Sequence, residues 1–239
     1  MKLTQEFTKI PRLVDIGRYC VTQFVKSVAT QLSPGTSILD AGAGECAYKQ
    51  LFTHCNYKSI DLGVGDSQWN YEHLDYIAPL DNMPIKDATF DAVLCTQVLE
   101  HLTRPLESVK EMHRVLKPGG YLFLTVPMSQ EEHQVPYDFF RYTSYGLKYI
   151  CSEAGFREIE VVSFGGMFLR WAYELPRVLP DIPRIGIKQG KFNMLGVLAF
   201  PVRSLLLFLV RSIQAILVAI DRFDKKKNDP WGWQLVARK

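Results

Sequence analysis

The sequence Ser37-Ile38-Leu39-Asp40-Ala41-Gly42-Ala43-Gly44 joins a short apolar run to a loop with two glycines. The apolar run predicts a buried strand, and we expect a helix after the loop, over about 47–53. Glycine in such a loop lets the chain turn sharply and lets a ligand approach the backbone closely. The stretch therefore predicts an α/β fold with a ligand site at the loop.

Further helices and strands are expected on both sides of this stretch, in alternation. The helical patterns cover 12–32, 103–116 and 145–154, and the strand patterns cover 57–60, 90–95, 121–126, 158–162 and 233–237. Alternation at this spacing predicts the α/β class, with a doubly wound, mostly parallel sheet and helices on both faces. In such sheets a ligand binds at the carboxyl ends of the strands, so the loops that follow the strands are expected to line one site.

The composition is that of a folded chain without a strong charge. It has 239 residues, 47% of them hydrophobic, which suits one large domain or one domain with an addition. A net charge of +3 is too small for a basic nucleic-acid surface, so no nucleic-acid partner is expected. The five cysteines form no C-x-x-C pair, and residues 1–7 hold no apolar core of a signal peptide. We therefore expect reduced thiols in a cytoplasmic protein.

Four parts are expected along the chain. A helical N-terminal extension covers 1–35, a cofactor-binding core covers 36–164, an apolar helical insertion covers 165–230, and the last strand of the core covers 231–239.

The insertion carries a nearly continuous apolar segment over 192–220, interrupted mainly by one proline and two arginines. On a helical wheel Arg211, Gln214 and Asp221 share one narrow sector, and apolar side chains cover the rest. A partner subunit, the protein's own core or a membrane interface could cover that surface. We expect peripheral attachment to a membrane surface through 192–220, with basic side chains at the lipid headgroups.

The glycine loop by itself fits more than one cofactor. The pattern Gly42-x-Gly44-x-x-Ala47 satisfies the G-x-G-x-x-G/A fingerprint of dinucleotide-binding proteins, and Asp61 lies 19 residues after Gly42. A carboxylate at the end of the second strand can accept two hydrogen bonds from a ribose diol. This pattern alone leaves a nicotinamide-dependent oxidoreductase open.

Four motifs in a fixed order narrow the choice. They are Ile38-Leu39-Asp40-Ala41-Gly42-Ala43-Gly44, Phe90-Asp91-Ala92-Val93, Val98-Leu99-Glu100-His101 and Arg114-Val115-Leu116-Lys117-Pro118-Gly119-Gly120. Together they resemble class I S-adenosylmethionine-dependent methyltransferases, and more narrowly the group with L-E-H after the fourth strand and R-V-L-K-P-G-G before the fifth. The resemblance spans about 36–163 and resumes at 232–239. It implies a seven-stranded sheet of the Rossmann-like methyltransferase fold, with a helical insertion before the last strand. The stretch 136–143 is similar to a P-Y-D-x-x-R-[YF]-T sequence in a subset of these enzymes.

The resemblance implies S-adenosyl-L-methionine as the cofactor and assigns residues to it. Asp40, Ala41, Gly42 and Gly44 would surround its methionine part, Asp61 would hold the ribose hydroxyls, Leu62 would lie against the adenine, and Thr96 and Gln97 would face it from the other side. The family usually has an acidic residue five positions before the proline of an L-P-F-like motif, where it touches the adenine amine. Pro79 stands at that position, which leaves Asp81 or a backbone carbonyl as the substitute.

The methyl acceptor is expected over the loop after the fifth strand. His133, Tyr137 and Asp138 lie in that loop and are the candidate catalytic residues. If the acceptor is a hydroxyl, a base is needed, and His133 and Asp138 are the candidates. The alternative for Asp138 is an ion pair with Arg141 that organises the loop.

Two other polar groups receive structural roles. In the resembled family the acid and histidine of the L-E-H motif, Glu100 and His101 in this chain, more often brace the loop and the following helix than act in catalysis. The five histidines show no metal-ligand spacing with the cysteines, so no metal is expected.

The sequence thus predicts an enzyme that transfers a methyl group from S-adenosyl-L-methionine to an unidentified small-molecule, lipid or glycan acceptor. Because the sulfonium methyl is already activated, the enzyme must mainly hold the acceptor in line with it. Two alternatives stay open: a nicotinamide-dependent oxidoreductase, and a non-catalytic partner subunit that binds the cofactor. The oligomeric state does not follow from the sequence.

Overall fold

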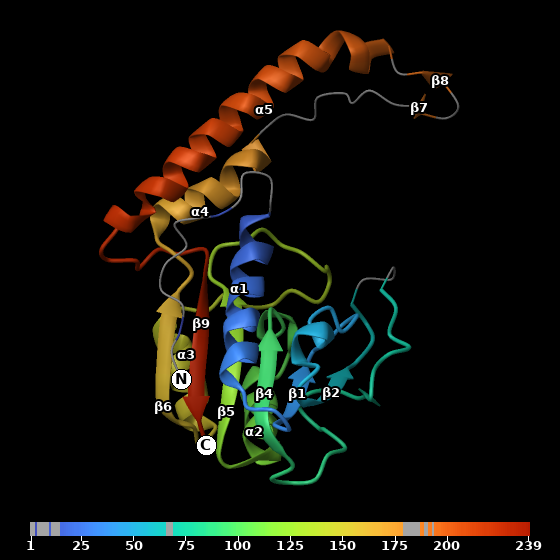
Figure 1. The fold of residues 1–239 in the computed structure, drawn as a ribbon, viewed down its shortest axis with the longest axis vertical. Coiled ribbons are helices and arrows are strands. Elements are labelled where there is room, and N and C mark those ends of the chain that lie inside the picture. The colour runs from blue at the N-terminus through green and yellow to red at the C-terminus, as the bar shows by residue number, and fades with distance from the viewer. Residues whose placement is uncertain are drawn as a thin grey trace. The chain divides into compact units, whose positions relative to one another are not determined.

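The computed structural model describes residues 3, 10, 15–65, 69–178, 187–188, 191–192 and 194–239. The chain forms two compact units. The core unit holds Cys20–Phe164 and Trp231–Lys239, and the insertion unit is built mainly from Gly165–Pro230. Figure 1 labels the helices and strands of both units.

A seven-stranded sheet forms the centre of the core unit. Its strands are β1 (Ser37–Ala41), β2 (Asn56–Asp61), β3 (Tyr76–Ile77), β4 (Phe90–Thr96), β5 (Leu116–Pro127), β6 (Arg157–Ser163) and β9 (Gly232–Arg238). They lie in the order β3-β2-β1-β4-β5-β9-β6. Neighbours from β3 to β5 pair in parallel, and β9 is antiparallel to both β5 and β6. The predicted doubly wound, mostly parallel, seven-stranded sheet is confirmed.

Three helices follow the predicted helical patterns: α1 (Ile16–Gln31), α2 (Pro105–Val115) and α3 (Ser144–Glu153). Residues 12–14 of the first pattern lie outside the described residues. The helix expected over 47–53 is only a short 3-10 turn, Lys49–Phe52. The backbone hydrogen bonds here join residues three apart, as from the N–H of Lys49 to the carbonyl of Cys46 at 3.0 Å and from that of Leu51 to Tyr48 at 2.9 Å.

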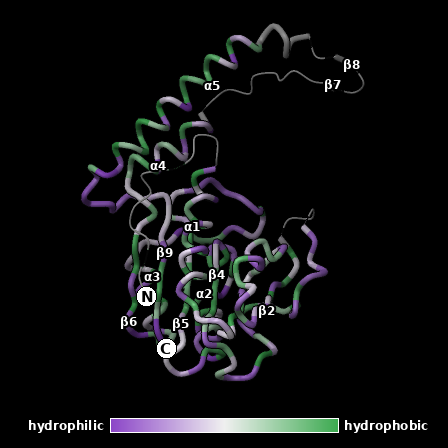
Figure 2. Tube along the Cα trace, in the orientation of Figure 1, coloured by the Kyte–Doolittle hydropathy of each residue, from purple (hydrophilic) through white to green (hydrophobic). Residues whose placement is uncertain are grey.

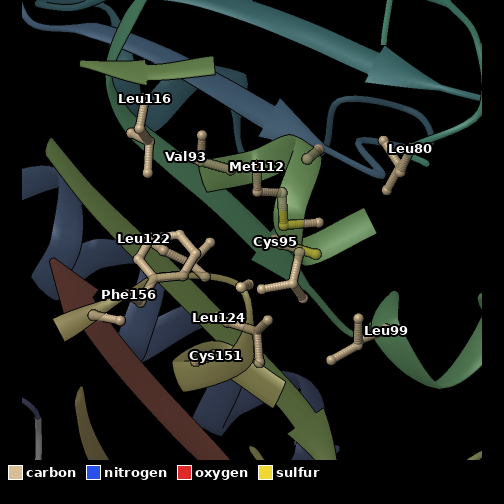
Figure 3. Packing of buried hydrophobic residues seen from close by; sticks show 14 of the residues in the cluster. Leu80, Val93, Cys95, Leu99, Met112, Leu116, Leu122, Leu124, Cys151 and Phe156 are labelled. Atoms are coloured by element: carbon tan, nitrogen blue, oxygen red, sulfur yellow. The ribbon is translucent and has the colours of Figure 1, made fainter. Parts of the chain in front are cut away.

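Buried side chains cover both faces of the sheet. On one face Val93, Leu122 and Leu124 belong to the same apolar cluster as Met112 of α2 and Cys151 of α3 (Figure 3). Helix α1 lies over the opposite face (Figure 1). A parallel sheet has apolar side chains on both faces. Polar chemistry is therefore left to the loops at the ends of the strands.

The insertion unit contains two helices and a small hairpin. Helix α4 (Met167–Glu174) packs on α5 (Met194–Ile220), and β7 (Ile187–Lys188) pairs with β8 (Lys191–Phe192). The predicted helical insertion before the last strand is confirmed.

Two carboxylates from the end of the insertion unit cap the start of α4. Asp221 accepts a hydrogen bond from the N–H of Gly166 at 3.0 Å, and Asp224 accepts one from the N–H of Met167 at 2.9 Å. The first N–H groups of a helix have no partner within the helix, so these bonds satisfy them. The beginning and the end of the insertion unit are thereby tied together.

Helix α5 buries Gln214 together with Val210 and Val218, and exposes many of its other apolar side chains. Gln214 is buried, and its Nε2 donates a hydrogen bond to the carbonyl of Ala172 in α4 at 2.7 Å. The exposed apolar side chains of this helix are Phe200, Val202, Leu205, Leu207, Phe208, Leu209, Ile213 and Ile216. Figure 2 shows the hydrophobic colour recurring along α5. A helix on a soluble domain usually keeps polar side chains on its outward face, whereas this helix has apolar ones there.

Candidate cofactor and acceptor site

The glycine loop follows β1 at the carboxyl end of the sheet. Gly42 has a φ of 81°, and its N–H donates a hydrogen bond to the carbonyl of Ile60 at 2.8 Å. A Cβ atom on Gly42 would lie 2.4 Å from Cγ2 of Val98, closer than such atoms come in proteins. Glycine is therefore required twice over at this position, for its backbone conformation and for space.

Asp61 ends β2 and holds the glycine loop. One of its carboxylate oxygens accepts a hydrogen bond from the N–H of Gly44 at 2.9 Å, and the other accepts one from the N–H of Gly63 at 2.8 Å. A carboxylate has about four acceptor positions, so Asp61 can also accept hydrogen bonds from a ribose. The next residue, Leu62, is 48% exposed and offers an apolar surface beside this carboxylate.

Asp40 lies buried at the end of β1. Its Oδ2 accepts a hydrogen bond from the hydroxyl of Tyr57 at 2.6 Å. Burial raises the pKa of Asp40 to about 6; the Tyr57 hydrogen bond opposes this rise, and the charge of Asp61 adds to it. Ala41, the next residue, has no exposed surface and belongs to the apolar core, and its expected contact with the cofactor stays a prediction.

The end of β4 is fastened to β5. Gln97 follows Thr96, the last residue of β4, and has a φ of 56°. Its N–H donates to the carbonyl of Thr125 at 2.9 Å, and its Nε2 donates to the hydroxyl of the same residue at 3.1 Å. Residues other than glycine that have a positive φ often lie at functional sites. Thr96 and Gln97 are therefore held at the expected edge of the sheet.

Asp81 has a partner within the protein. Its carboxylate accepts a hydrogen bond from the guanidinium of Arg104 at 3.2 Å. The contact joins the loop after β3 to the residue before α2. Asp81 must share its oxygens with Arg104 if it also binds an adenine amine.

The loop after β5 is organised by an ion pair. Arg141 donates two hydrogen bonds to Asp138, at 2.6 and 2.8 Å, and the N–H of His133 donates to the same carboxylate at 2.9 Å. These bonds, with the Arg141 hydrogen bond first among the causes, hold the pKa of Asp138 at about 2. The ion pair with Arg141, the alternative expected for Asp138, is thus present, and the base role of Asp138 stays a prediction. Tyr137 remains 45% exposed in this loop.

The L-E-H motif forms a short 3-10 turn, Leu99–His101, that braces the same loop. The carbonyl of Glu100 accepts hydrogen bonds from the N–H groups of Phe139 and Phe140 at 2.9 and 3.1 Å. The Glu100 side chain is fully buried, and burial raises its pKa to about 8. His101 contacts the carbonyl of Tyr137 through Nδ1. Burial lowers the pKa of His101, which favours the neutral imidazole.

The fold brings His133 beside this turn, which the sequence spacing did not indicate. The imidazole rings of His101 and His133 pack edge to face, with centroids 4.7 Å apart. The two histidines follow β4 and β5, which are neighbours in the sheet, although they lie far apart in the sequence. Spacing along the chain could not reveal this pair, because the pairing of the two strands creates it.

Residues 39–124 match the methyltransferase domain family. These residues, about a third of the chain, are therefore similar to a methyltransferase domain. The matched residues begin in β1 and end in β5, so they include the glycine loop, Asp61 and the L-E-H turn. The match confirms the predicted class of enzyme for this domain. The narrower L-E-H subgroup stays a prediction.

Curated proteins resemble part of this chain. It is 31% identical over 115 residues to the tRNA (carboxymethyluridine(34)-5-O)-methyltransferase of Arabidopsis thaliana. The aligned stretch is 45% of this chain and 28% of that protein. It is 31% identical over 99 residues to a probable S-adenosylmethionine-dependent methyltransferase of Mycolicibacterium smegmatis. This alignment covers 39% of this chain and 38% of that protein. The chain therefore spans well under half the length of these two relatives.

Solved structures share the fold. An S-adenosylmethionine-dependent methyltransferase from Archaeoglobus fulgidus aligns with a TM-score of 0.58 at 15% identity, over 93% of this chain and 94% of that chain. At this identity the likeness concerns the fold alone. It agrees with the mostly parallel sheet.

Proposed function

We propose that this methyltransferase binds S-adenosyl-L-methionine at the glycine loop and transfers its methyl group to a small-molecule, lipid or glycan acceptor. The observation that carries the proposal is the loop itself. Gly42 has no room for a side chain, and the carboxylate of Asp61 accepts hydrogen bonds from the N–H groups of Gly44 and Gly63. These residues lie in or next to β1 and β2, within the residues that match the family model. A loop built in this way presents backbone and one carboxylate to a ribose-containing ligand.

The polar groups around the loop suit this cofactor. The carboxylate of Asp40 complements the ammonium of its methionine part, and Asp61 complements the ribose hydroxyls. Leu62 offers its exposed side chain to the adenine, and Thr96 with Gln97 completes the site from the end of β4. Each of these residues lies at the carboxyl end of β1, β2 or β4.

Methyl transfer requires positioning more than activation. The methyl carbon leaves the sulfonium sulfur, which becomes a neutral thioether, and bonds to the acceptor atom. Holding the acceptor in line supplies up to about 7–11 kcal/mol in the best intramolecular cases. The loop after β5 exposes Tyr137 and Phe139 and can hold an acceptor with apolar surface. For a hydroxyl acceptor, His133 is the candidate base, because Asp138 is bound to Arg141.

Calorimetric titration of the full chain with S-adenosylmethionine, its demethylated product and NAD tests the cofactor assignment. We expect both adenosyl compounds to bind and NAD not to bind. Binding of NAD alone would favour the oxidoreductase alternative. Transfer of a labelled methyl group to the lipid or small-molecule fraction of a cell extract is expected next. Label in the RNA fraction would contradict the proposed acceptor class, and no transfer to any fraction would favour a non-catalytic binding subunit.

The raised pKa of Asp40 makes cofactor affinity depend on pH. Below a pH of about 6 the Asp40 carboxyl is protonated and neutral, so it no longer attracts the cofactor ammonium. We expect the affinity for S-adenosylmethionine to fall as the pH decreases below that value, by up to about tenfold per pH unit. Asp40→Asn is expected to bind more weakly near neutral pH and to lack this decline. An equal decline in the variant, measured by calorimetry, would assign the pH dependence to another group.

We further propose that this protein is cytoplasmic and attaches to a membrane surface through α5. One supporting observation is the exposed apolar surface of this helix. A second is that the helical stretch Phe200–Phe223 is long and apolar enough to cross a membrane by length and composition. Arg203 lies among these apolar side chains, and Lys225–Lys227 follow the helix closely. Basic groups beside an apolar helix face favour the interface of anionic lipids.

Flotation with anionic liposomes tests the membrane proposal. The full chain is expected to float, and Leu205→Glu/Phe208→Glu/Ile216→Glu is expected to stay at the bottom, because charged side chains oppose entry into the acyl region. The matched control is Tyr145→Glu/Tyr149→Glu, which changes exposed aromatic residues of α3 and should float. A full chain that fails to float would contradict the proposal.

A further inference from the structure

Three side chains that can bind metal ions meet beyond the ends of β4 and β5. Glu100 and His101 lie in the turn Leu99–His101, and His133 lies in the loop after β5. One ligand atom from each, a carboxylate oxygen or an imidazole nitrogen, lies within 4.8 Å of the other two. These residues come from two separate loops, so the sheet holds the cluster together.

The hydrogen bonds of both histidines leave the same ring nitrogen available. Nδ1 of His101 lies 2.5 Å from the carbonyl oxygen of Tyr137, and Nδ1 of His133 lies 3.0 Å from that of Glu131. A carbonyl oxygen can only accept, so each Nδ1 carries the proton and each Nε2 keeps a free lone pair. Histidines that bind metals are usually held in this way, with the second nitrogen donating to a carbonyl or carboxylate.

The Glu100 carboxylate supplies an independent observation. Its side chain has no exposed surface, and neither oxygen accepts a hydrogen bond from another residue. Nε2 of His101 is also buried without a partner, 3.8 Å from Oε1 of Glu100. Buried polar atoms normally have partners, and an unpaired buried carboxylate is strongly unfavourable. A cation between the two side chains would satisfy both.

We propose that Glu100, His101 and His133 bind a divalent transition-metal ion such as Zn²⁺. Two imidazoles and one carboxylate form a donor set that such ions prefer. Tetrahedral bonds of about 2.0–2.2 Å place ligand atoms about 3.3 Å apart, so the present atoms need to approach by about 1.5 Å at most. Three protein ligands leave a fourth position open, as in catalytic metal sites.

The ion pair of Asp138 and Arg141 then has a positioning role around the metal. Asp138 accepts the N–H of His133 and lies 3.4 Å from Nδ1 of its ring. Outer groups of this kind fix the orientation of a ligating imidazole. Binding of the metal stands on this geometry alone, whereas a use of the open position for an acceptor oxygen rests on the proposed methyl transfer.

Titration of the full chain with Co²⁺ after removal of bound metal by a chelator tests the site. We expect one Co²⁺ per chain, with visible absorption that disappears when Zn²⁺ displaces it. Glu100→Gln keeps the size of the side chain, and His133→Ala removes a partly exposed ligand. Loss of a residue that only hydrogen-bonds to a metal ligand weakens metal binding by ~10–100-fold. Each of these two variants is expected to weaken Co²⁺ binding by more than that. The control is His73→Ala, an exposed histidine outside the cluster, which should bind Co²⁺ as the wild type does.

The same samples separate this inference from the proposed function. Circular dichroism and calorimetric binding of S-adenosylhomocysteine report whether each variant is folded. Wild-type protein that binds neither Co²⁺ nor Zn²⁺ stoichiometrically would overturn the metal site, and so would wild-type Co²⁺ affinity in Glu100→Gln. A chain that binds Co²⁺ but no adenosyl compound would overturn the proposed function and leave the metal site in place.

Discussion

Gly42→Ala is expected to abolish measurable binding of S-adenosylmethionine. Alanine at a φ of 81° carries a backbone cost of about 1–2 kcal/mol. Its Cβ would also lie 2.4 Å from Cγ2 and 2.6 Å from Cγ1 of Val98, so either Val98 or the loop must move. Movement of the loop would break the hydrogen bond from the N–H of Gly42 to Ile60 and displace the surface that faces the cofactor.

A matched glycine separates the two causes. Gly35 has a φ of 82°, and a Cβ added there would meet no atom within 4 Å. Gly35→Ala should therefore lose stability through the backbone term alone and should keep its cofactor affinity. Urea unfolding and calorimetry with S-adenosylhomocysteine measure both quantities. Equal affinity in the two variants would show that the contact with Val98 does not shape the site.

Asp61→Ala is expected to weaken cofactor binding by about 10- to 150-fold. The estimate follows from roughly 1.5–3 kcal/mol for hydrogen bonds to a charged group. The substitution removes the acceptor for any ribose hydroxyl and also frees the N–H groups of Gly44 and Gly63. The fold should survive, because Asp61 lies at the end of β2, outside the apolar core.

Asp75 provides the control for this substitution. Its carboxylate accepts a hydrogen bond from the N–H of Ser59, which lies in β2 as Asp61 does, and it pairs with Lys58 at 2.6 Å. In the described hydrogen bonds it does not contact the glycine loop. Asp75→Ala should lower the free energy of unfolding and leave the dissociation constant of S-adenosylhomocysteine unchanged. A folded Asp61→Ala variant with wild-type affinity would remove Asp61 from the site.

The long strands and helices could be predicted from the sequence because each leaves a periodic apolar pattern. Strand β3 escapes such reasoning, since its two residues are too short to show a period. The segment expected as a helix over 47–53 forms only the short 3-10 turn Lys49–Phe52, and its apolar pattern does not distinguish the two. The burial of Gln214 against α4 depends on tertiary packing, which a helical wheel cannot show.

Parts of the candidate site could also be predicted from local patterns in the sequence. Asp61 could be placed because it ends a predicted strand, and Asp138 could be paired with Arg141 because they lie three residues apart. The approach of His133 to Glu100 and His101 could not be foreseen, because it depends on the pairing of β4 with β5. The lack of a partner for the Glu100 carboxylate becomes visible only when every neighbouring atom has a position.

The carboxylates that cap α4 also bear on how the chain loses entropy when it folds. Strand β6 pairs only with β9 in the described sheet, yet residues 164–231 separate the two strands. Closing a flexible loop of that length costs about 2.5 kcal/mol more than closing a four-residue turn. Asp221 and Asp224 hold the start of the insertion against its end, so a folded insertion acts as a short connection. Early folding of the insertion would thus lower the entropic barrier to placing β9, the strand on which completion of the sheet depends.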